Sequence, residues 1–212
     1  EDFAGFDAQL IIMDVVPWML PYYEASGIQF EIEDNRDYMD YTFTPEQFLA
    51  GMDTQDDRYR YNYFKRRFAY ETEEITPFHR EEIREFMERE WCGEKTCEEC
   101  HCGCLLRVID NLVPVFDKIR INGILVRVEG KMAGLCIVSC RNGLGVYQYK
   151  NAVNRIKGIN EYLLRESFER YLQSADTINY TEDMGVENLR YYKEHMAPAH
   201  TLLSKLTLTE RG

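Results

Sequence analysis

Residues 124–149 read ILVRVEGKMAGLCIVSCRNGLGVYQY. The stretch holds three runs rich in β-branched and aromatic residues, separated by Glu129-Gly130-Lys131 and Arg141-Asn142-Gly143. Each separator is short and contains a glycine, which can adopt the positive φ of a tight hairpin turn. The stretch therefore predicts a three-stranded antiparallel meander, with strands at residues 124–128, 132–140 and 144–149.

Helical patterns lie on both sides of this meander. Before it, Thr76-Pro77 has the capping residue and first-turn proline of a helix that runs to Trp91, and residues 105–119 place apolar side chains at helical spacing. A meander followed by strand–helix–strand units implies an α/β (α+β) fold, in which helices flank a mixed sheet. The elements predicted after the meander are a helix at 158–172, a strand at 177–180, a helix at 185–195 and a last strand at 203–208.

The first part of the chain repeats the end of this order. Residues 9–16 are typical of a strand, residues 17–25 of a short helix and residues 28–33 of a second strand. We therefore expect two related halves, of which the first is incomplete. The predicted division is residues 1–68, the closing part of the first half plus a basic connecting helix, and residues 69–212, a complete second half.

The composition indicates a globular protein without a membrane segment. Apolar residues make up 45% of the 212 residues and aromatic residues 13%, which is enough for a large core. The formal net charge of −12 argues against a general nucleic-acid-binding protein, although it leaves room for a local basic patch. The longest apolar run, residues 10–20, is interrupted by Asp14 and Pro17 and is too short to span a bilayer.

Seven cysteines occur, and five of them are crowded between Cys92 and Cys104. An odd number with most members in one cluster favours reduced thiols in a cytoplasmic protein over a disulfide scaffold. Zinc usually takes two separated pairs of ligands, and only one such pair is present here, so we expect no bound metal. The alternative is a tight site made by Cys97, Cys100, Cys102 and Cys104.

One candidate site is the loop Arg155-Ile156-Lys157-Gly158-Ile159-Asn160, which opens the helix predicted at 158–172. Such a loop points backbone N–H groups and the positive end of the helix dipole at an anion, and Arg155 and Lys157 add charge. The loop resembles the R-x-x-G-x-G/A pyrophosphate loop of GCN5-related acetyltransferases, except that Asn160 replaces a small residue. The other interpretation is an ordinary basic start of a helix.

A second candidate site is Ile178–Lys193, where a β-branched run ends in an acidic turn and a helix follows. Asp183 or Glu182 can act as a general base if its surroundings tune its pKa. Arg190 and Lys193 lie three residues apart on one helix face and can hold a phosphate or carboxylate. The alternative is a helix-capping acid with two solvated cations.

The segment Arg58–Phe68 alternates basic residues with tyrosine and phenylalanine. Such a surface can bind an anionic or nucleic-acid partner. The same spacing suits a partly buried helix whose basic side chains reach solvent along their apolar stems, and we favour that interpretation.

Three groups of residues together carry a family likeness. Near the end of the chain they are Asn179, Glu182, Asp183, Gly185, Leu189, Arg190, Lys193 and Pro198; upstream they are Arg36–Tyr41 and Tyr63–Phe68. The first group resembles the N-x-x-E-D-x-G-x-x-x-L-R-x-x-K…P signature of the phosphatidylglycerol lysyltransferase C-terminal domain family. The upstream groups are similar to that family's R-D-x-x-D-Y and K-R-x…F segments, and Lys150 and Gly158 fall where it has a lysine and a glycine.

The resemblance implies a tandem of GCN5-related acetyltransferase-like (GNAT-like) folds that passes an aminoacyl group from a charged tRNA to a lipid hydroxyl. We hypothesise that Asp183 and Glu182 are the catalytic residues, with Asp183 as base or substrate orienter. The expected substrate-binding residues are Arg190, Lys193, Asn179, Lys150 and a basic wall of Lys65, Arg66 and Arg67. The expected site for the donor phosphate or the tRNA 3′ end consists of Arg155, Lys157 and Gly158.

We therefore expect a cytoplasmic acyltransferase-like protein that moves an acyl or aminoacyl group to an amine or hydroxyl, such as that of a lipid headgroup. The expected partner is the acceptor end of an aminoacyl-tRNA. The rival hypothesis is an acyl-CoA-dependent N-acetyltransferase that uses the Arg155–Gly158 loop. A third hypothesis is a non-catalytic binding protein that keeps the cleft. Two features of this chain, its net negative charge and its cysteine cluster, depart from the family pattern.

Overall fold

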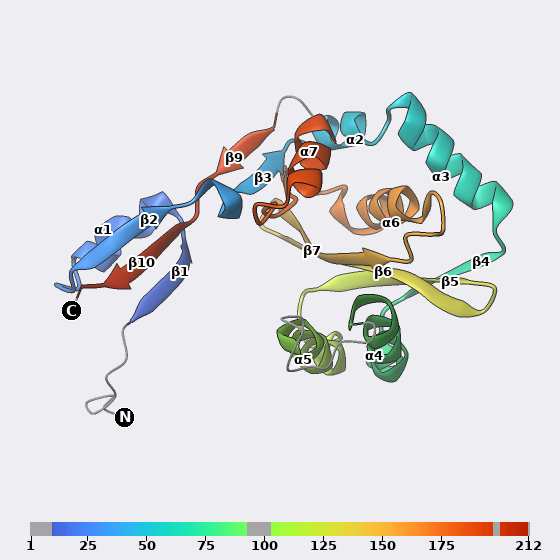
Figure 1. Ribbon diagram of the computed structural model, residues 1–212, viewed down its shortest axis with the longest axis horizontal. Coiled ribbons are helices and arrows are strands. Elements are labelled where there is room, and N and C mark those ends of the chain that lie inside the picture. Colours follow the sequence, from blue (N-terminus) through green and yellow to red (C-terminus); the bar gives the residue numbers. More distant parts are fainter. Residues whose placement is uncertain (1–9, 93–102, 197–199, 212) are drawn as a thin grey trace. The chain divides into compact units, whose positions relative to one another are not determined.

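The computed structural model describes residues 10–92, 103–196 and 200–211, with only the backbone for residues 91–92 and 103–107 (Figure 1). Internal contacts divide the chain into two compact units. Unit 1 comprises Glu1–Thr42 and Thr181–Gly212, and unit 2 comprises Phe43–Tyr180. This division differs from the predicted halves 1–68 and 69–212, because the strand at the end of the chain pairs with strands at its beginning. The two halves themselves stay a prediction.

Unit 2 is built on a mixed sheet whose strands run in the order β4-β5-β6-β7-β8. The predicted meander is confirmed as β5, β6 and β7, which pair antiparallel in sequence order, and β8 adds to β7 in parallel. Both meander turns have two consecutive residues at positive φ, which matches the twist of the strands they join. The strands are β4 (Tyr70–Glu74), β5 (Asn122–Val128), β6 (Lys131–Arg141), β7 (Leu144–Ala152) and β8 (Thr177–Asn179).

Helices cover both faces of this sheet. In Figure 1, α3 and α6 lie on one side of it and α4 and α5 on the other. The helix predicted at 158–172 is α6 followed by a π-helical turn, η6. The α-helices of unit 2 are α2 (Pro45–Gly51), α3 (Gln55–Arg67), α4 (Arg80–Met87), α5 (Gly103–Leu112) and α6 (Ile159–Ser167); the shorter turns are η3 (Pro77–His79), η4 (Glu88–Cys92), η5 (Val113–Val115) and η6 (Phe168–Leu172).

Aromatic rings fill the core under α6 and α2. Phe48 is fully buried and stacks on Tyr147 and Phe168, with ring centroids 5.1 and 5.9 Å apart. Phe64 of α3 packs against Tyr162 of α6 with centroids 4.9 Å apart. Aromatic pairs of this kind add to the free energy that burial already supplies, so α3 and α6 are held together by a dry contact.

Unit 1 contains two groups of strands, β1-β10-β2 and β3-β9, each antiparallel. The single last strand predicted at 203–208 is wrong: the chain forms two strands that are interrupted at Ser204-Lys205, and β3 was not expected at all. The elements are β1 (Ile11–Val15), η1 (Pro17–Met19), α1 (Leu20–Glu24), β2 (Phe30–Asp34), η2 (Arg36–Tyr38), β3 (Asp40–Phe43), α7 (Glu187–Met196), β9 (Thr201–Leu203) and β10 (Leu206–Glu210).

The interruption between β9 and β10 has an electrostatic cause. Lys205 turns inward, and its Nζ lies 2.9 Å from Asp40 Oδ1 and 3.0 Å from Glu182 Oε2. The alternating pattern predicts one strand because it treats Lys205 as a solvent-facing residue. It therefore does not predict the interruption between β9 and β10. None of the helices within the described ranges is both long and apolar enough to cross a bilayer.

Candidate functional site

The turn at residues 181–186 in unit 1 has an unusual backbone. Thr181 and Met184 have φ values of 57° and 53°, a region that residues with a side chain rarely occupy. Gly185 follows with a φ of 71°, and an added Cβ there would lie 2.7 Å from Oδ2 of Asp37. Such a conformation persists only when surrounding contacts determine it, and here Tyr41, Asp37, Lys193 and Asp183 all hydrogen-bond to the backbone of the turn.

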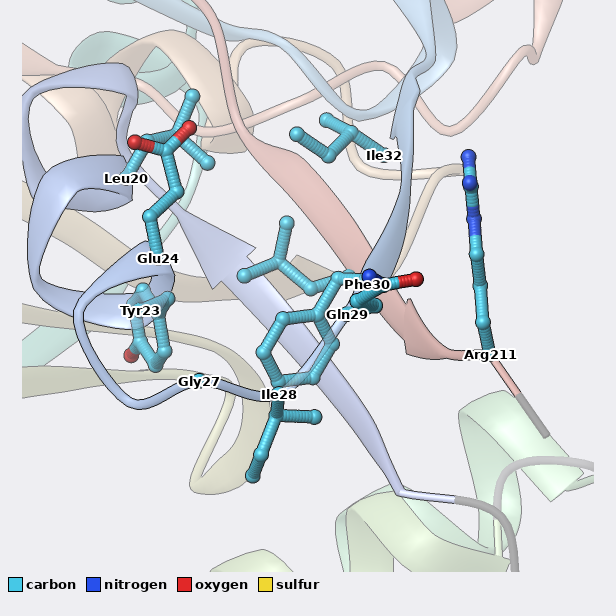
Figure 2. A pocket seen from close by; sticks show the side chains of 10 residues that line it. Leu20, Tyr23, Glu24, Gly27, Ile28, Gln29, Phe30, Ile32 and Arg211 are labelled. Carbon is cyan, nitrogen blue, oxygen red and sulfur yellow. The ribbon is translucent and has the colours of Figure 1, made fainter.

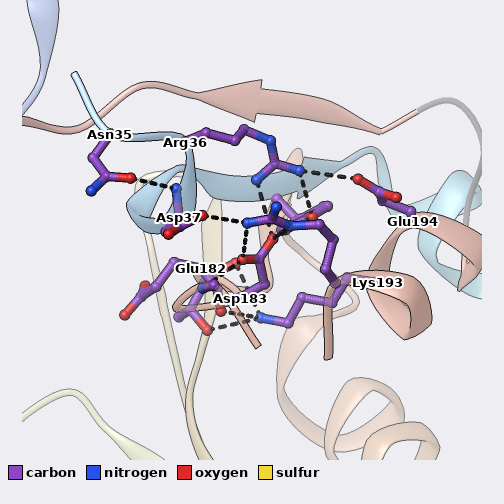
Figure 3. A network of polar contacts seen from close by, with 11 residues as sticks. Asn35, Arg36, Asp37, Glu182, Asp183, Lys193 and Glu194 are labelled. Carbon is purple, nitrogen blue, oxygen red and sulfur yellow. Dashed lines mark hydrogen bonds and ion pairs between the residues drawn. The ribbon is translucent and has the colours of Figure 1, made fainter. Parts of the chain in front are cut away.

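The carboxylate of Asp183 is 0% exposed and is surrounded by donors (Figure 3). Its Oδ2 accepts hydrogen bonds from Arg36 Nη1 at 3.1 Å, Tyr41 Oη at 2.6 Å and Arg190 Nε at 3.0 Å. Its Oδ1 accepts from Arg190 Nη2 at 2.8 Å and from the Gly185 backbone N–H at 2.9 Å. Five donors occupy the lone pairs of this carboxylate.

This environment decides which role of Asp183 the geometry favours. Burial raises the pKa of the Asp183 carboxyl, but the hydrogen bonds from Arg190, Tyr41 and the Gly185 amide outweigh it and hold the pKa well below its usual range. A general base at neutral pH needs a free lone pair and a pKa near the working pH. The arrangement therefore favours Asp183 as an orienter of Arg36 and Arg190.

Both guanidinium groups reach the edge of this network. Arg190 Nη2 also lies 2.5 Å from Asp37 Oδ1, and Arg36 Nη2 donates to Tyr41 Oη at 2.7 Å and to Glu194 Oε1 at 3.1 Å. The side chains of Arg36 and Arg190 are 32% and 33% exposed. Both guanidinium groups are therefore partly open to solvent, and the anion-binding role of Arg190 stays a prediction.

Lys193 is buried, whereas its spacing from Arg190 predicts a cation on an accessible helix face. It is 3% exposed, and its Nζ donates to the carbonyl oxygens of Thr181 at 3.2 Å and Glu182 at 2.7 Å. Its ammonium also lies 5.7 Å from the centre of the Tyr41 ring. Because it caps the strained turn from inside, Lys193 is better placed to hold that turn than to bind an incoming anion.

Glu182 points into a second cluster in unit 1. Lys205 Nζ lies 3.0 Å from Glu182 Oε2 and 3.4 Å from Asp14 Oδ1, and it also contacts Asp40. Burial raises the pKa of the Glu182 carboxyl. A backbone hydrogen bond and the neighbouring Lys205 lower it by more, so the net shift of this pKa is downward. Glu182 is therefore held ionised beside Lys205.

The predicted donor loop lies in unit 2. Arg155 is 77% exposed, and its Nη2 is 3.7 Å from Glu90 Oε1. The ammonium of Lys157 lies 4.7 Å from the centre of the Tyr59 ring. Gly158 has a φ of 88°, and an added Cβ would lie 2.1 Å from the carbonyl oxygen of Arg60, so close packing of α3 against α6 is sufficient to explain this glycine.

The other predicted substrate-binding residues also belong to unit 2. Asn179 is buried in β8, and Lys150 lies in β7 with its Nζ 2.6 Å from Oδ1 of Asn160. The basic wall is exposed at the C-terminal end of α3 and consists of Lys65, Arg66 and Arg67. The structure thus brings Asp183, Arg190 and Lys193 together in unit 1, while the donor loop, Lys150 and the basic wall lie in unit 2.

Some predicted residues lie outside the described residues, namely Cys97, Cys100, Cys102 and Pro198. The backbone of Cys104 begins α5, but its side chain is not described. Within the described ranges, no three His, Cys, Asp or Glu side chains are grouped so that they could hold a metal ion.

Sequence reasoning missed the roles of Arg36, Asp37, Tyr41, Glu194 and Lys205. The first three belong to the Arg36–Tyr41 segment that resembles the family pattern, but no spacing connects them with Asp183, which lies 147 residues after Arg36. Arg36, Asp37 and Tyr41 were therefore visible as a motif and not as partners of a buried acid.

Unit 1 also contains a cavity of about 490 Å³ between α1 and β2 (Figure 2). Its lining is about as polar as it is apolar: Tyr23, Phe30 and Leu208 line it together with the charged residues Glu24 and Arg211. None of the site residues predicted from the sequence lines it. Such a lining can take a ligand that carries both apolar and polar groups.

The ionised state of Asp183 predicts a pH dependence of stability. Its pKa is depressed in the folded state relative to about 3.9 in the unfolded chain. The stability that it contributes is therefore fully present above pH ~4 and is lost as the pH falls through the folded pKa below that value. Urea denaturation between pH 2.5 and 7 should show this loss in the wild type and a smaller loss in Asp183→Asn, whereas Asp117→Asn, which changes an exposed acid, should follow the wild type.

Three comparisons with known proteins bear on this site. The family model described as phosphatidylglycerol lysyltransferase, C-terminal, matches residues 1–204. The chain is also similar to solved structures, among them three with identities of 10–24%, which show the fold alone. No curated protein matches it.

The first of these structures is a conserved protein of unknown function from Bacteroides thetaiotaomicron, with 24% identity and a TM-score of 0.77 over 96% of this chain and 70% of that one. L-PGS from Bacillus licheniformis matches with 15% identity and a TM-score of 0.67 over 96% and 69% of the two chains. A tandem GNAT protein from the clavulanic acid biosynthesis pathway matches with 10% identity and a TM-score of 0.56 over 95% and 62%. The fold is therefore GNAT-like, as predicted.

Proposed function

Because this chain belongs to the phosphatidylglycerol lysyltransferase C-terminal family, we propose that it transfers an aminoacyl group from aminoacyl-tRNA to a hydroxyl or amine, such as that of a lipid headgroup. The family and the GNAT-like fold point to an acyltransferase domain. The finer statement, which names the donor and the acceptor, rests on surface chemistry of the two units.

The basic end of α3 is the observation that carries this proposal. Lys65, Arg66 and Arg67 are consecutive and exposed, and none of them forms an ion pair with another described residue. The same helix presents the ring of Tyr59, which is 53% exposed, and Tyr61 lies beside the ammonium of Lys65. On a chain with a net charge of −12, three cations without an ion-pair partner among the described residues, on a helix that also presents the exposed ring of Tyr59, suit the phosphates and bases of a single-stranded RNA end.

Unit 1 offers features that suit the acceptor. Arg36 and Arg190 are oriented by Asp183 and stay about one-third exposed, so they can bind an anionic headgroup. The cavity between α1 and β2 is lined by apolar side chains and by Arg211, so it can take an apolar group of the acceptor beside a polar one. In the proposed reaction the acceptor oxygen or nitrogen attacks the carbonyl carbon of the aminoacyl ester, and the bond from that carbon to the ribose oxygen breaks. The ribose oxygen leaves with the electron pair of that bond and takes up a proton, and the acceptor gives up one proton.

Neutralising the basic end of α3 tests the donor. We expect the variant Lys65→Gln/Arg66→Gln/Arg67→Gln to bind an aminoacyl-tRNA acceptor minihelix more weakly. The plot of log binding constant against log salt concentration should become shallower, its negative slope shrinking by about 2, because each lost phosphate contact to a single strand removes about 0.7 from the slope. The measurement is fluorescence anisotropy at several salt concentrations.

The matched control changes three exposed cations elsewhere in unit 2, Lys118→Gln/Arg120→Gln/Arg141→Gln. It removes the same charge, so a general electrostatic effect would weaken both variants equally and would sink the proposed RNA surface. Transfer itself is followed with labelled aminoacyl-tRNA and phosphatidylglycerol vesicles. RNA binding without transfer to any acceptor would favour the non-catalytic binding protein.

One observation favours an acyl-CoA-dependent enzyme as the second candidate. β8 pairs with β7 only along Leu144–Val146, and β7 continues to Ala152 beside the start of α6. A strand edge next to a helix N-terminus can take up an extended ligand that ends in a phosphate. A rise in melting temperature with acetyl-CoA, and none with the minihelix, would favour this candidate.

A further inference from the structure

Lys150 stands apart from the residues used so far. It lies in the part of β7 beyond the pairing with β8, opposite Cys136 of β6. Residues on this face of the sheet point toward α6, since an added Cβ on Gly134 would lie 2.9 Å from the Leu163 side chain. The amine of Lys150 is therefore held between the sheet and the first turn of α6, in a residue that is half-buried as a whole.

The surroundings of this amine do not favour its charged form. Burial lowers the pKa of Lys150. The positive end of the α6 dipole acts in the same direction, because Asn160 belongs to the first turn of that helix. The one hydrogen-bond partner described for Nζ is a neutral amide oxygen, Asn160 Oδ1, at 2.6 Å.

Two titratable groups face Lys150 from the neighbouring elements, Cys136 on β6 and Glu161 on α6. Burial raises the pKa of the Cys136 thiol to about 11, so this thiol is neutral near pH 7 and offers no counter-charge. The carboxylate of Glu161 would stabilise an ammonium, but it lies 3.6 Å from Arg60 Nη1, which competes for it. No carboxylate among the described residues forms an ion pair with Lys150.

Asn160 also explains a departure noted in the sequence. The R-x-x-G-x-G/A pattern has a small residue at this position, and here the side chain is large enough to reach across to β7. Its amide oxygen fixes Nζ without supplying negative charge. The position that departs from a phosphate-binding loop therefore holds a primary amine in place.

We propose that Lys150 is an acylation site of the protein itself, whose amine accepts an acyl group from an activated ester or thioester. The Nζ lone pair attacks the acyl carbon, the C–N bond forms, and the C–S or C–O bond breaks. The departing sulfur or oxygen takes the electron pair of that bond, and the proton lost from nitrogen goes to it or to solvent. The product is an Nε-acyl-lysine, which differs from the transfer to an external acceptor proposed above.

The test uses a thioester that is too small to require a nucleotide site, S-acetyl-N-acetylcysteamine, with the full chain at pH 7.5. Mass spectrometry gives the acylation rate of each lysine. We expect Lys150 to react at least about fivefold faster than the exposed Lys131, because each unit by which a pKa falls raises the neutral fraction about tenfold. The ratio should fall as the pH rises toward the ordinary lysine pKa of ~10.4, because the neutral fraction of exposed amines then grows as well.

Two variants at Asn160 separate charge from packing. Asn160→Asp places a carboxylate beside Nζ and should slow acylation of Lys150 about tenfold, whereas Asn160→Leu keeps the site neutral and should leave it reactive. Lys131 should be unaffected in both variants. A Lys150 that reacts no faster than Lys131 in the wild type would overturn the proposal without any variant, and this assay contains no tRNA, so its outcome is separate from that of the proposed function.

Discussion

Replacing Asp183 with alanine is expected to destabilise the protein by about 3 kcal/mol, because it removes the acceptor that five donors share. Breaking a buried ion pair by removing one partner typically costs about 3–5 kcal/mol. We take the lower end because Arg36 and Arg190 are one-third exposed and regain some hydration. The Gly185 N–H in the strained turn would also lose its acceptor, Asp183 Oδ1.

Urea denaturation followed by circular dichroism measures this loss. The matched control is Glu194→Ala, which removes a second carboxylate from Arg36 but one that is 42% exposed, so we expect a loss below about 1 kcal/mol. Equal losses in the two variants would mean that the Asp183 network contributes no more than a surface ion pair. In that case its proposed role as an orienter of Arg36 and Arg190 would be wrong.

The fold could be predicted from the sequence where local patterns decide it. The turns Glu129-Gly130 and Asn142-Gly143 require positive φ, so the meander follows from the chain itself, although the register shifts at Val126/Arg127 and Ile137/Val138 do not. The strand β3 could not be predicted in this way, because it has only four residues and its first, Asp40, is a buried acid. Its partner β9 lies about 160 residues later, and no local pattern carries that pairing.

The same limit applies to the candidate site. The stretch Ile178–Lys193 could be identified because it combines an acid, a glycine and two cations. Their roles could not be assigned, since Lys193 looks solvated by spacing but donates to the carbonyl oxygens of its own turn. Arg36 and Tyr41 are as close to Asp183 as Arg190 is, and only the tertiary fold brings them there.

The signature residues of unit 1 therefore act first on one another. Asp183 positions two arginines, and Lys193 and Gly185 keep the turn that carries Asp183. A pattern of this kind fixes the direction of the exposed guanidinium edges, which is what recognition of an anion requires. Variants at Asp183 should for this reason affect binding of an anionic acceptor as well as stability.

Gly158→Ala is expected to be as damaging as the loss of Asp183, at about 3 kcal/mol or more. The left-handed backbone at Gly158 costs a residue with a Cβ about 1–2 kcal/mol. In addition, the new methyl group would lie 2.1 Å from the carbonyl oxygen of Arg60 and 3.0 Å from Cβ of Phe64, both in α3. Because these are backbone and near-backbone atoms, α3 itself must move away from α6.

Gly130→Ala provides the matched control for this variant. Gly130 also has a positive φ, 75°, but no atom lies within 4 Å of the position its Cβ would occupy. It should therefore lose only the backbone term, about 1–2 kcal/mol, in the same denaturation experiment. If the two variants lose equal stability, the packing of α3 does not require a glycine at position 158. If Gly158→Ala keeps its stability but no longer binds acetyl-CoA or the minihelix, the glycine instead allows a phosphate to approach the backbone, as the loop pattern predicts.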